Sequence, residues 1–284
     1  MDLKHDTPTH DTQTHDAAPN DAAPNGTAAR SRTYKNVAAV YDLVYETRTE
    51  DVEFYVEQVV KAAPRRLAEF GCGTGRVTLK LAERLPDTRI VAVDMDADEV
   101  EVLADSLRAR GIDTVETHCG LIQDFEAEGL DMAIAPFRVF QHVTDPAEFE
   151  ACLTRVARSL RPGGVFVFDL FNPSVPLLAK TGRIVSQVFE DGDGNRIERV
   201  VDVNERDHFR QTQFVEEDYT VTTPEGETYD LHWHYHTRYY FLGEVVPLVE
   251  RAGFEVVRID SDYRGTPFGE GEYPGDLVFH LVRK

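Results

Sequence analysis

Three glycines at alternate positions, Gly71, Gly73 and Gly75, are the residues whose type and spacing most directly suggest chemistry in this chain of 284 residues. An apolar run, Leu67–Phe70, leads into them, and a helical spacing of apolar residues follows from Val77. A strand, a tight turn and a helix start in this order hold a nucleotide-like ligand against backbone N–H groups. Glycine is expected here because the chain bends sharply and a Cβ would intrude on the ligand.

Asp94 adds a second polar group to this predicted site. It ends Arg89–Asp94, a nearly continuous apolar run that is typical of a strand buried on both faces of a parallel sheet. At the end of such a strand, a carboxylate can accept hydrogen bonds from both hydroxyls of a ribose. The alternative is that Asp94 caps the helix that follows.

The glycine spacing distinguishes between classes of nucleotide-binding protein. A dinucleotide fingerprint, Gly-x-Gly-x-x-Gly, needs a glycine where this chain has Arg76. A P-loop is excluded because no Gly-Lys-Ser/Thr follows the turn. An NAD-dependent oxidoreductase is therefore a disfavoured alternative.

Strand and helix patterns alternate around these residues, which predicts a doubly wound α/β sheet with right-handed crossovers. The ligand of such a sheet binds at the carboxyl ends of the strands. Besides the strand before the glycines and the helix that runs from them to Leu85, the predicted elements are helix Tyr34–Ala62, strand Arg89–Asp94, helix Asp98–Arg110, strand Thr114–Cys119, strand Met132–Ala135, helix Ala147–Leu160, strand Val165–Asp169, helix Gly243–Arg251 and strands Phe254–Asp260 and Asp276–Arg283.

Between residues 183 and 240 the pattern changes to alternating residues with turn signals, which predicts an inserted antiparallel sheet. Its expected strands include Arg196–Val203, Gln211–Tyr219 and Leu231–Tyr240. The insertion would cap the ligand face or form the surface of a homodimer. We expect four parts in the chain: a disordered low-complexity tail at 1–30, a cofactor-binding core at 31–182, the inserted β subdomain at 183–240, and a last helix with two core strands at 241–284.

The composition excludes some partners. The formal net charge is −21, with 51 acidic and 30 basic side chains, so a large nucleic-acid surface is not expected. No apolar window approaches the roughly 18 residues of a membrane span, and the polar N-terminus has no signal-peptide core. We therefore expect a cytoplasmic protein without a membrane partner.

The chain resembles the class I S-adenosylmethionine-dependent methyltransferases. The resemblance lies in Glu69–Gly75, Val93–Met95, Asp131–Pro136 and Leu160–Gly164, which occur in the order of that family between about 65 and 170. It implies a Rossmann-like sheet of seven strands. The insertion and the opening Tyr41-Asp42-Leu43 are similar to small-molecule methyltransferases, including those that N-methylate sugars.

The resemblance implies S-adenosylmethionine as the cofactor and assigns it a set of binding residues. The glycines would approach its methionine and ribose parts, Asp94 would hold the ribose diol, and Met95 would pack on the adenine. Leu121 departs from the family, which commonly has an acidic residue there for the adenine amine. The implied cofactor-binding residues are Glu69, Gly71, Gly73, Gly75, Asp94, Met95, Leu121, Ile122 and Ala135.

The acceptor side is expected to be built from the segment after strand Met132–Ala135, the N-terminal helix and the inserted sheet. Methyl transfer needs alignment, exclusion of water and, where the nucleophile carries a proton, a base. His142 matches a histidine of the sugar N-methyltransferases and is the candidate base, unless it merely packs beneath the loop. Arg138 pairs with a carboxylate of the substrate or cofactor, or else forms a structural ion pair. Tyr41 and Phe137 are the other candidate substrate residues.

His232, His234 and His236 alternate along one predicted strand, so their side chains should project from one face. Trp233 and Tyr235 would then lie on the other face. Zinc sites usually take ligands from several elements, so we expect no metal here and favour the wall of a substrate pocket or a dimer seam.

The sequence thus predicts a methyltransferase that uses S-adenosylmethionine and acts on an amine or hydroxyl of a small molecule. A non-catalytic module that binds adenosylmethionine is the alternative from another class. Turnover with any acceptor would distinguish the two.

Overall fold

The computed structural model describes Val40, residues 43–45 and residues 48–284. The expectations for the tail at 1–30 and for Tyr41 lie outside the described residues, as does much of the helix predicted from Tyr34. Within the described part, helix α2 spans Glu50–Ala62, and Arg48 and Thr49 before it are not helical. A single helix up to Ala62 is therefore wrong. The backbone carbonyl of Arg48 instead accepts a hydrogen bond of 2.9 Å from Nη1 of Arg76.

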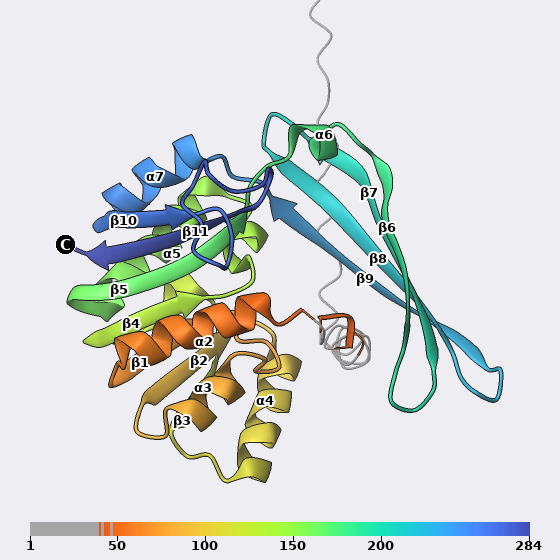
Figure 1. Ribbon diagram of the computed structural model, residues 1–284, viewed down its shortest axis with the longest axis horizontal. Coiled ribbons are helices and arrows are strands. Elements are labelled where there is room, and N and C mark those ends of the chain that lie inside the picture. The colour runs from red at the N-terminus through yellow and green to blue at the C-terminus, as the bar shows by residue number, and fades with distance from the viewer. Residues whose placement is uncertain (1–39, 41–42, 46–47) are drawn as a thin grey trace, which may run out of the picture.

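A seven-stranded sheet forms the core, in the order β10-β11-β5-β4-β1-β2-β3 (Figure 1). Strands β1 to β5 pair in parallel, whereas β11 is antiparallel to both β5 and β10. The order confirms the predicted doubly wound class. The strands are β1 Arg66–Phe70, β2 Arg89–Asp94, β3 Val115–Cys119, β4 Leu130–Ala135, β5 Leu160–Phe171, β10 Phe254–Asp260 and β11 Asp276–Arg283.

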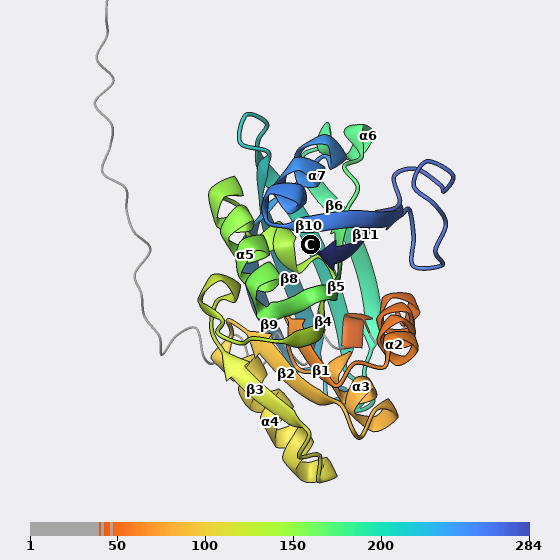
Figure 2. The same ribbon diagram turned by 90° about the vertical axis from the view of Figure 1, so that its left-hand side faces the viewer.

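Helices cover both faces of this sheet (Figure 2). On one face, α2 and α3 bury Val59 and Leu81 against Leu67 of β1. On the other face, α5 and α7 bury Phe149 and Val245 together with aromatic residues of the sheet. The remaining helix, α4, packs on β2 and β3. The helices are α3 Thr78–Arg84, α4 Ala97–Arg110, α5 Pro146–Ser159 and α7 Leu242–Arg251, with short segments η1 Ile122–Asp124, η2 Val139–His142 and α6 Val175–Leu178.

The start of β5 differs from the prediction. The predicted helix ends at Leu160 and the predicted strand begins at Val165, but β5 begins at Leu160. Leu160 pairs with Leu130 of β4, and regular pairing resumes only at Val165 with Met132. The intervening residues lie outside the register of both neighbours, so the missing N–H of Pro162 disrupts no ladder bond.

The insertion forms a four-stranded antiparallel sheet in the order β6-β7-β8-β9, which extends away from the core as a long twisted ribbon (Figure 1). Val40 and Val44, before α2, pack against Ile197 and Tyr219 on one face of this sheet. Val40 and Val44 are thus held by the insertion. The strands are β6 Gly182–Glu190, β7 Arg196–Asp207, β8 Thr212–Thr222 and β9 Thr228–Arg238.

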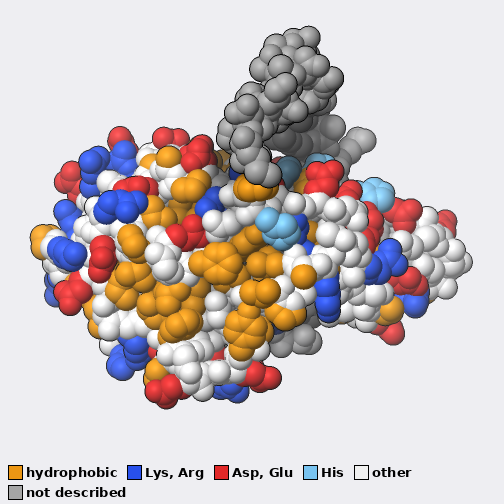
Figure 3. All heavy atoms as spheres, turned by 90° about the horizontal axis from the view of Figure 1, so that it is seen from above, with side chains coloured by type: hydrophobic (Ala, Val, Ile, Leu, Met, Phe, Trp, Pro, Cys, Tyr) orange, Lys and Arg blue, Asp and Glu red, His pale blue; other side chains and the backbone are white. Residues whose placement is uncertain are grey.

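Two surface properties bear on the expected partners. No helix among the described residues is long and apolar enough to cross a membrane. On the face seen in Figure 3, acidic and basic side chains are interspersed around a central apolar area. That face therefore lacks the continuous basic surface that a phosphate backbone requires.

Candidate functional site

The glycine turn connects β1 to α3 at the carboxyl edge of the sheet. All three glycines have positive φ, at +70°, +53° and +97° for Gly71, Gly73 and Gly75. A Cβ at Gly71 would overlap the side chain of Val139, and one at Gly75 would overlap that of Leu103. Glycine is thus required at both positions by backbone conformation and by packing within the protein, before any ligand is considered.

Asp94 lies beside this turn. Its Oδ2 accepts a hydrogen bond of 2.8 Å from the N–H of Gly73, and its Oδ1 accepts one of 3.0 Å from Asp96 N–H. Burial raises the pKa of the Asp94 carboxyl above its ordinary value. The N-cap of α4 is Asp96, whose side chain accepts from the N–H groups of Asp98 and Glu99. The alternative that Asp94 caps this helix is therefore wrong.

Apolar side chains stand exposed next to Asp94. Met95 follows it and is 70% exposed, and Leu121, which follows β3, is 41% exposed. The N–H of Gly120 donates to the carbonyl of Asp94 at 2.8 Å, which brings the two strand ends together. Ile122 is half-buried beside them. The arrangement leaves an apolar surface beside a carboxylate, which fits a flat apolar ring attached to a diol.

Glu69 lies beneath the glycine turn and is only 1% exposed. Its Oε2 accepts a hydrogen bond of 2.7 Å from the hydroxyl of Thr78. Burial, together with the nearby charge of Asp94, raises the pKa of Glu69 to about 8. In this position the carboxyl supports the turn from within the protein, and direct contact with a cofactor stays a prediction.

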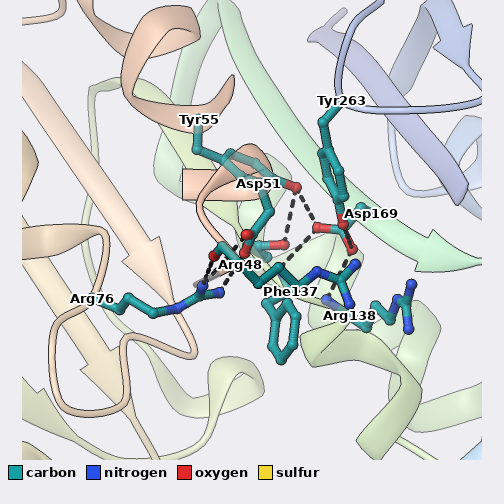
Figure 4. A network of polar contacts seen from close by, with 9 residues as sticks. Arg48, Asp51, Tyr55, Arg76, Phe137, Arg138, Asp169 and Tyr263 are labelled. Atoms are coloured by element: carbon teal, nitrogen blue, oxygen red, sulfur yellow. Dashed lines mark hydrogen bonds and ion pairs between the residues drawn. The ribbon is translucent and has the colours of Figure 1, made fainter. Parts of the chain in front are cut away.

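The turn after β4 has an unusual backbone. Phe137 and Arg138 both adopt left-handed conformations, with φ of +62° and +64°. Such values are uncommon for residues other than glycine. The N–H of Phe137 donates to Oδ1 of Asp169 at 2.8 Å, and the N–H of Arg138 donates to Oδ2 at 3.0 Å (Figure 4). One carboxylate therefore holds both residues of the turn.

Asp169 receives two further hydrogen bonds, from the hydroxyls of Tyr55 at 2.6 Å and Tyr263 at 3.0 Å. The Tyr55 hydroxyl also lies 3.5 Å from the carbonyl of Ala135, one of the predicted cofactor residues. Burial raises the pKa of Asp169 to about 6. Sequence reasoning missed Asp169, although it ends the apolar run Val165–Asp169 as Asp94 ends Arg89–Asp94; in the structure β5 continues to Phe171.

The side chain of Phe137 is surrounded by residues from the N-terminal part of the chain. The ring of Tyr45 meets it edge-on at 4.9 Å. The guanidinium groups of Arg48 and Arg76 lie over it at 5.2 and 4.8 Å (Figure 4). Arg76 also forms an ion pair with buried Asp51. Phe137 thus brings the glycine turn and the segment before α2 together.

Arg138 turns away from this cluster toward β11. Its Nη2 forms an ion pair of 2.7 Å with Oδ1 of Asp276, and its guanidinium lies 5.3 Å from the ring of Phe171. The structure therefore contains the structural ion pair that was one of the two alternatives for Arg138. Its pairing with a substrate or cofactor carboxylate stays a prediction.

His142 ends η2 and faces the inserted sheet. The residue keeps part of its surface open to solvent, and its ring lies 5.3 Å from that of Tyr235 on β9. Desolvation by the protein around the ring lowers the pKa of His142 below its ordinary value. The imidazole is therefore neutral near pH 7 and able to accept a proton.

A buried ion pair lies behind Tyr235 in the inserted sheet. Oε2 of Glu217 accepts hydrogen bonds of 3.0 and 2.9 Å from Nε and Nη2 of Arg199, and its Oε1 accepts one of 2.8 Å from the hydroxyl of Tyr235. Nη2 of Arg199 also donates to the hydroxyl of Tyr45 at 3.2 Å. Tyr45, which touches Phe137, is thus fixed by the inserted sheet.

The three histidines of β9 lie on the opposite face of the sheet from Tyr235. His232 pairs with Asp218 at 2.6 Å, and the rings of His234 and His236 lie beside Phe214. Over the described residues, no group of three or more histidine, cysteine or acidic side chains is placed to hold a metal ion. The three imidazoles of β9 and the ring of Tyr235 therefore lie on opposite faces of the inserted sheet and cannot line one pocket wall.

Comparison with known proteins agrees with this architecture. The model of a methyltransferase domain family matches residues 67–164, which contain the glycine turn, Asp94 and the turn after β4. The cypemycin N-terminal methyltransferase of Streptomyces sp is 26% identical to this chain over 205 residues, which are 72% of this chain and 78% of that protein.

Two solved structures share the fold over most of both chains. The S-adenosylmethionine-bound CalS10 of Micromonospora echinaspora, an amino pentose methyltransferase, has a TM-score of 0.67 at 19% identity and covers 86% of this chain and 97% of its own. The sugar N-methyltransferase KedS8 of Streptoalloteichus sp has a TM-score of 0.64 at 19% identity, and the match covers 97% of this chain and 100% of KedS8. Residues 67–164 thus form a methyltransferase domain, and the chain shares the fold of S-adenosylmethionine-dependent methyltransferases.

Proposed function

We propose that this methyltransferase transfers the methyl group to an amine of a small molecule, with amino sugars as the first class to test and a hydroxyl as the alternative nucleophile. The observation that carries the proposal is the aromatic wall beside the strand ends, formed by Tyr45, Phe137, His142 and Tyr235. The two solved structures that act on amino sugars, or N-methylate sugars, support it by sharing the fold.

The cofactor would lie along the carboxyl edge of the sheet. The turn of Gly71, Gly73 and Gly75 and the carbonyl of Ala135 would line its methionyl part. Asp94 would accept from the ribose diol, and the exposed side chains of Met95 and Leu121 would cover the adenine. When bound, S-adenosylmethionine supplies the methyl group on its sulfonium.

The acceptor would bind between the turn after β4 and the inserted sheet. The ring of Phe137 already carries the guanidinium groups of Arg48 and Arg76. The ring of Tyr235 would favour a ligand that carries a positive charge, because a cation is attracted to the face of an aromatic ring. The rings of the wall also exclude water from the reacting atoms. Such a lining suits a protonated amine better than a neutral alcohol.

His142 is the group proposed to remove the proton. An amine must lose its proton before its lone pair can attack, and a neutral imidazole can accept it. The lowered pKa of His142 keeps the ring neutral near pH 7. His142 is thus a candidate general base whose ring faces the wall at Tyr235.

The test is a screen of methyl acceptors in which release of S-adenosylhomocysteine is measured. Each amino sugar is paired with the sugar that has a hydroxyl in place of the amine, and turnover is expected for the amine alone. His142→Ala should lower kcat about 10²-fold or more. His234→Ala, on the opposite face of the sheet, is the matched control and should leave kcat unchanged.

Two outcomes would contradict the proposal. Turnover of the hydroxyl compound but not the amine would make the enzyme an O-methyltransferase. Binding of the cofactor without turnover of any small acceptor would favour the non-catalytic module.

We also propose the inserted sheet as the surface of a homodimer, because its outer face exposes His232, His234 and His236, the last two of them beside Phe214. Light scattering on the full chain tests this, and a monomer at micromolar concentration would refute it. The cytoplasmic location and the domain boundaries at 30, 182 and 240 stay predictions from the sequence.

A further inference from the structure

The turn at Phe137 and Arg138 is held in a conformation that its own residues disfavour. A side chain with a Cβ crowds the backbone when φ is positive, and here two such residues follow each other. A strained backbone of this kind persists only when its surroundings fix it, and it occurs preferentially at functional sites. The question is which group fixes this turn.

Asp169 is that group. It lies on β5 and is completely buried, and its two oxygens accept one hydrogen bond each from the N–H groups of Phe137 and Arg138. The hydroxyls of Tyr55 from α2 and Tyr263 from the β10–β11 connection donate two further hydrogen bonds to this carboxylate. The carboxylate therefore accepts from four donors on three separate segments (Figure 4).

The turn determines where the acceptor wall lies. The ring of Phe137 contacts Tyr45, and it also supports Arg48 and Arg76. His142 follows in the same segment, at the end of η2. A change of backbone conformation at the turn would displace both Phe137 and His142 relative to β4.

We propose that Asp169 is a positioning residue for methyl transfer: its ionised carboxylate holds the Phe137–Arg138 turn left-handed, and the turn places the acceptor wall against the cofactor edge. Asp169 is buried and acts through the turn without touching the reacting atoms. The assignment of this wall to the acceptor rests on the proposed function.

The charged and titratable groups around Asp169 come from every element packed against it. They are Tyr55 and Asp51 on α2, Tyr263 in the β10–β11 connection, Arg138 in the turn and Asp276 on β11. Arg138 and Asp276 pair with each other. Burial raises the pKa of Asp169 to about 6, so the carboxylate is ionised above that pH and protonated below it.

The first test measures amide hydrogen exchange at Phe137 and Arg138 in the ligand-free full chain. Asp169→Asn replaces one acceptor oxygen by an NH₂ group, so exchange at these amides should rise about tenfold or more. Exchange in β1 should stay as in the wild type. Tyr273→Phe, in the same connection as Tyr263 but bonded to Pro173 and Val175, is the matched control and should change nothing at the turn.

A second variant covers the case in which Asp169→Asn fails to fold. Tyr55→Phe removes one donor to the carboxylate, so the Asp169 pKa should rise and the pH at which the turn amides lose protection should rise with it, after correction for intrinsic exchange rates. Unchanged exchange at Phe137 and Arg138 in both variants would overturn the proposal.

The second test uses any acceptor found by the screen. Tyr55→Phe and Asp169→Asn should lower kcat/KM for the acceptor about tenfold or more, while the affinity for S-adenosylhomocysteine changes much less. Faster exchange with unchanged acceptor kinetics would refute the positioning role. If no acceptor is turned over, the proposed function fails and the exchange result still decides whether Asp169 holds the turn.

Discussion

The N–H of Gly73 donates a hydrogen bond of 2.8 Å to Oδ2 of Asp94, which joins the glycine turn after β1 to the end of β2. Both residues were singled out from the sequence for their expected contact with a ligand. The bond shows that Asp94 also orders the turn. One carboxylate is therefore placed both to fix the glycine turn and to accept hydrogen bonds from a diol.

Asp94→Ala should therefore weaken the binding of S-adenosylhomocysteine by about 1–3 kcal/mol, since a charged acceptor and the order of the turn are lost together. Isothermal titration calorimetry measures this loss. Asp96→Ala is the matched control, because it removes the N-cap of α4 and should cost about 1 kcal/mol of stability with little effect on affinity. Equal affinity of Asp94→Ala and the wild type would remove Asp94 from the site.

Glu69 gives a prediction about pH and stability. Its pKa is about 8 in the folded protein, against an ordinary value of 4.5. The folded state thus binds this proton more tightly than the unfolded chain, so the free energy of unfolding falls as pH rises from 4.5 to about 8. Glu69→Gln abolishes this loss and should be more stable than the wild type above about pH 8, by on the order of 5 kcal/mol.

Urea denaturation between about pH 6.5 and 8.5 isolates this effect, because the ionisation of Asp169, whose pKa is about 6, is largely complete there. The wild type should lose stability across that range, while Glu69→Gln should stay nearly level. Parallel pH dependences of the two proteins would show that Glu69 is ionised in the folded state at neutral pH.

Gly71→Ala tests the packing of the glycine turn. The new Cβ would overlap Val139 and would force a non-glycine residue to a φ of +70°, so we expect a loss of several kcal/mol of stability and of cofactor binding. Gly111→Ala is the control, since it has a similar φ of +65° with no atom within 4 Å of its Cβ. It should cost only about 1–2 kcal/mol. Similar losses for the two variants in thermal unfolding would contradict the role of Val139.

Removing one partner of the buried ion pair between Arg199 and Glu217 should destabilise the inserted sheet. Arg199 is 7% exposed and Glu217 is 2% exposed. Arg199→Met leaves a buried carboxylate without its cation and should cost about 3–5 kcal/mol. Arg210→Met, from the exposed pair with Asp207, should cost less than about 1 kcal/mol. Denaturant unfolding compares the two, and a small loss for Arg199→Met would contradict the buried network.

Much of the fold was predictable because buried strands leave a local pattern. Arg89–Asp94, Phe254–Asp260 and Asp276–Arg283 coincide with β2, β10 and β11, since each is an apolar run bounded by polar or turn residues. The start of β5 was not predictable. Pro162 and two glycines normally end an element, and only the irregular pairing with β4 accommodates them.

Only those site residues that lie within a recognisable sequence motif were predictable. Asp94 and the glycines lie in segments that the family pattern covers, and their contact follows from the order of parallel strands. Asp169 was missed because its partners, Tyr55 and Tyr263, are distant in the chain and meet only in the folded structure. Likewise, no local pattern predicts the left-handed conformations of Phe137 and Arg138, since neither residue is a glycine.

We expect the cofactor to lie along the edge formed by the glycine turn, the ends of β2 and β3, and the turn after β4. Amide hydrogen exchange of the full chain with saturating S-adenosylhomocysteine, compared with the free protein and with NAD, tests this placement. Residues 71–76, 94–96, 119–122 and 135–138 should all become protected with S-adenosylhomocysteine and not with NAD. Absence of binding, or protection confined to the inserted sheet, would contradict this placement.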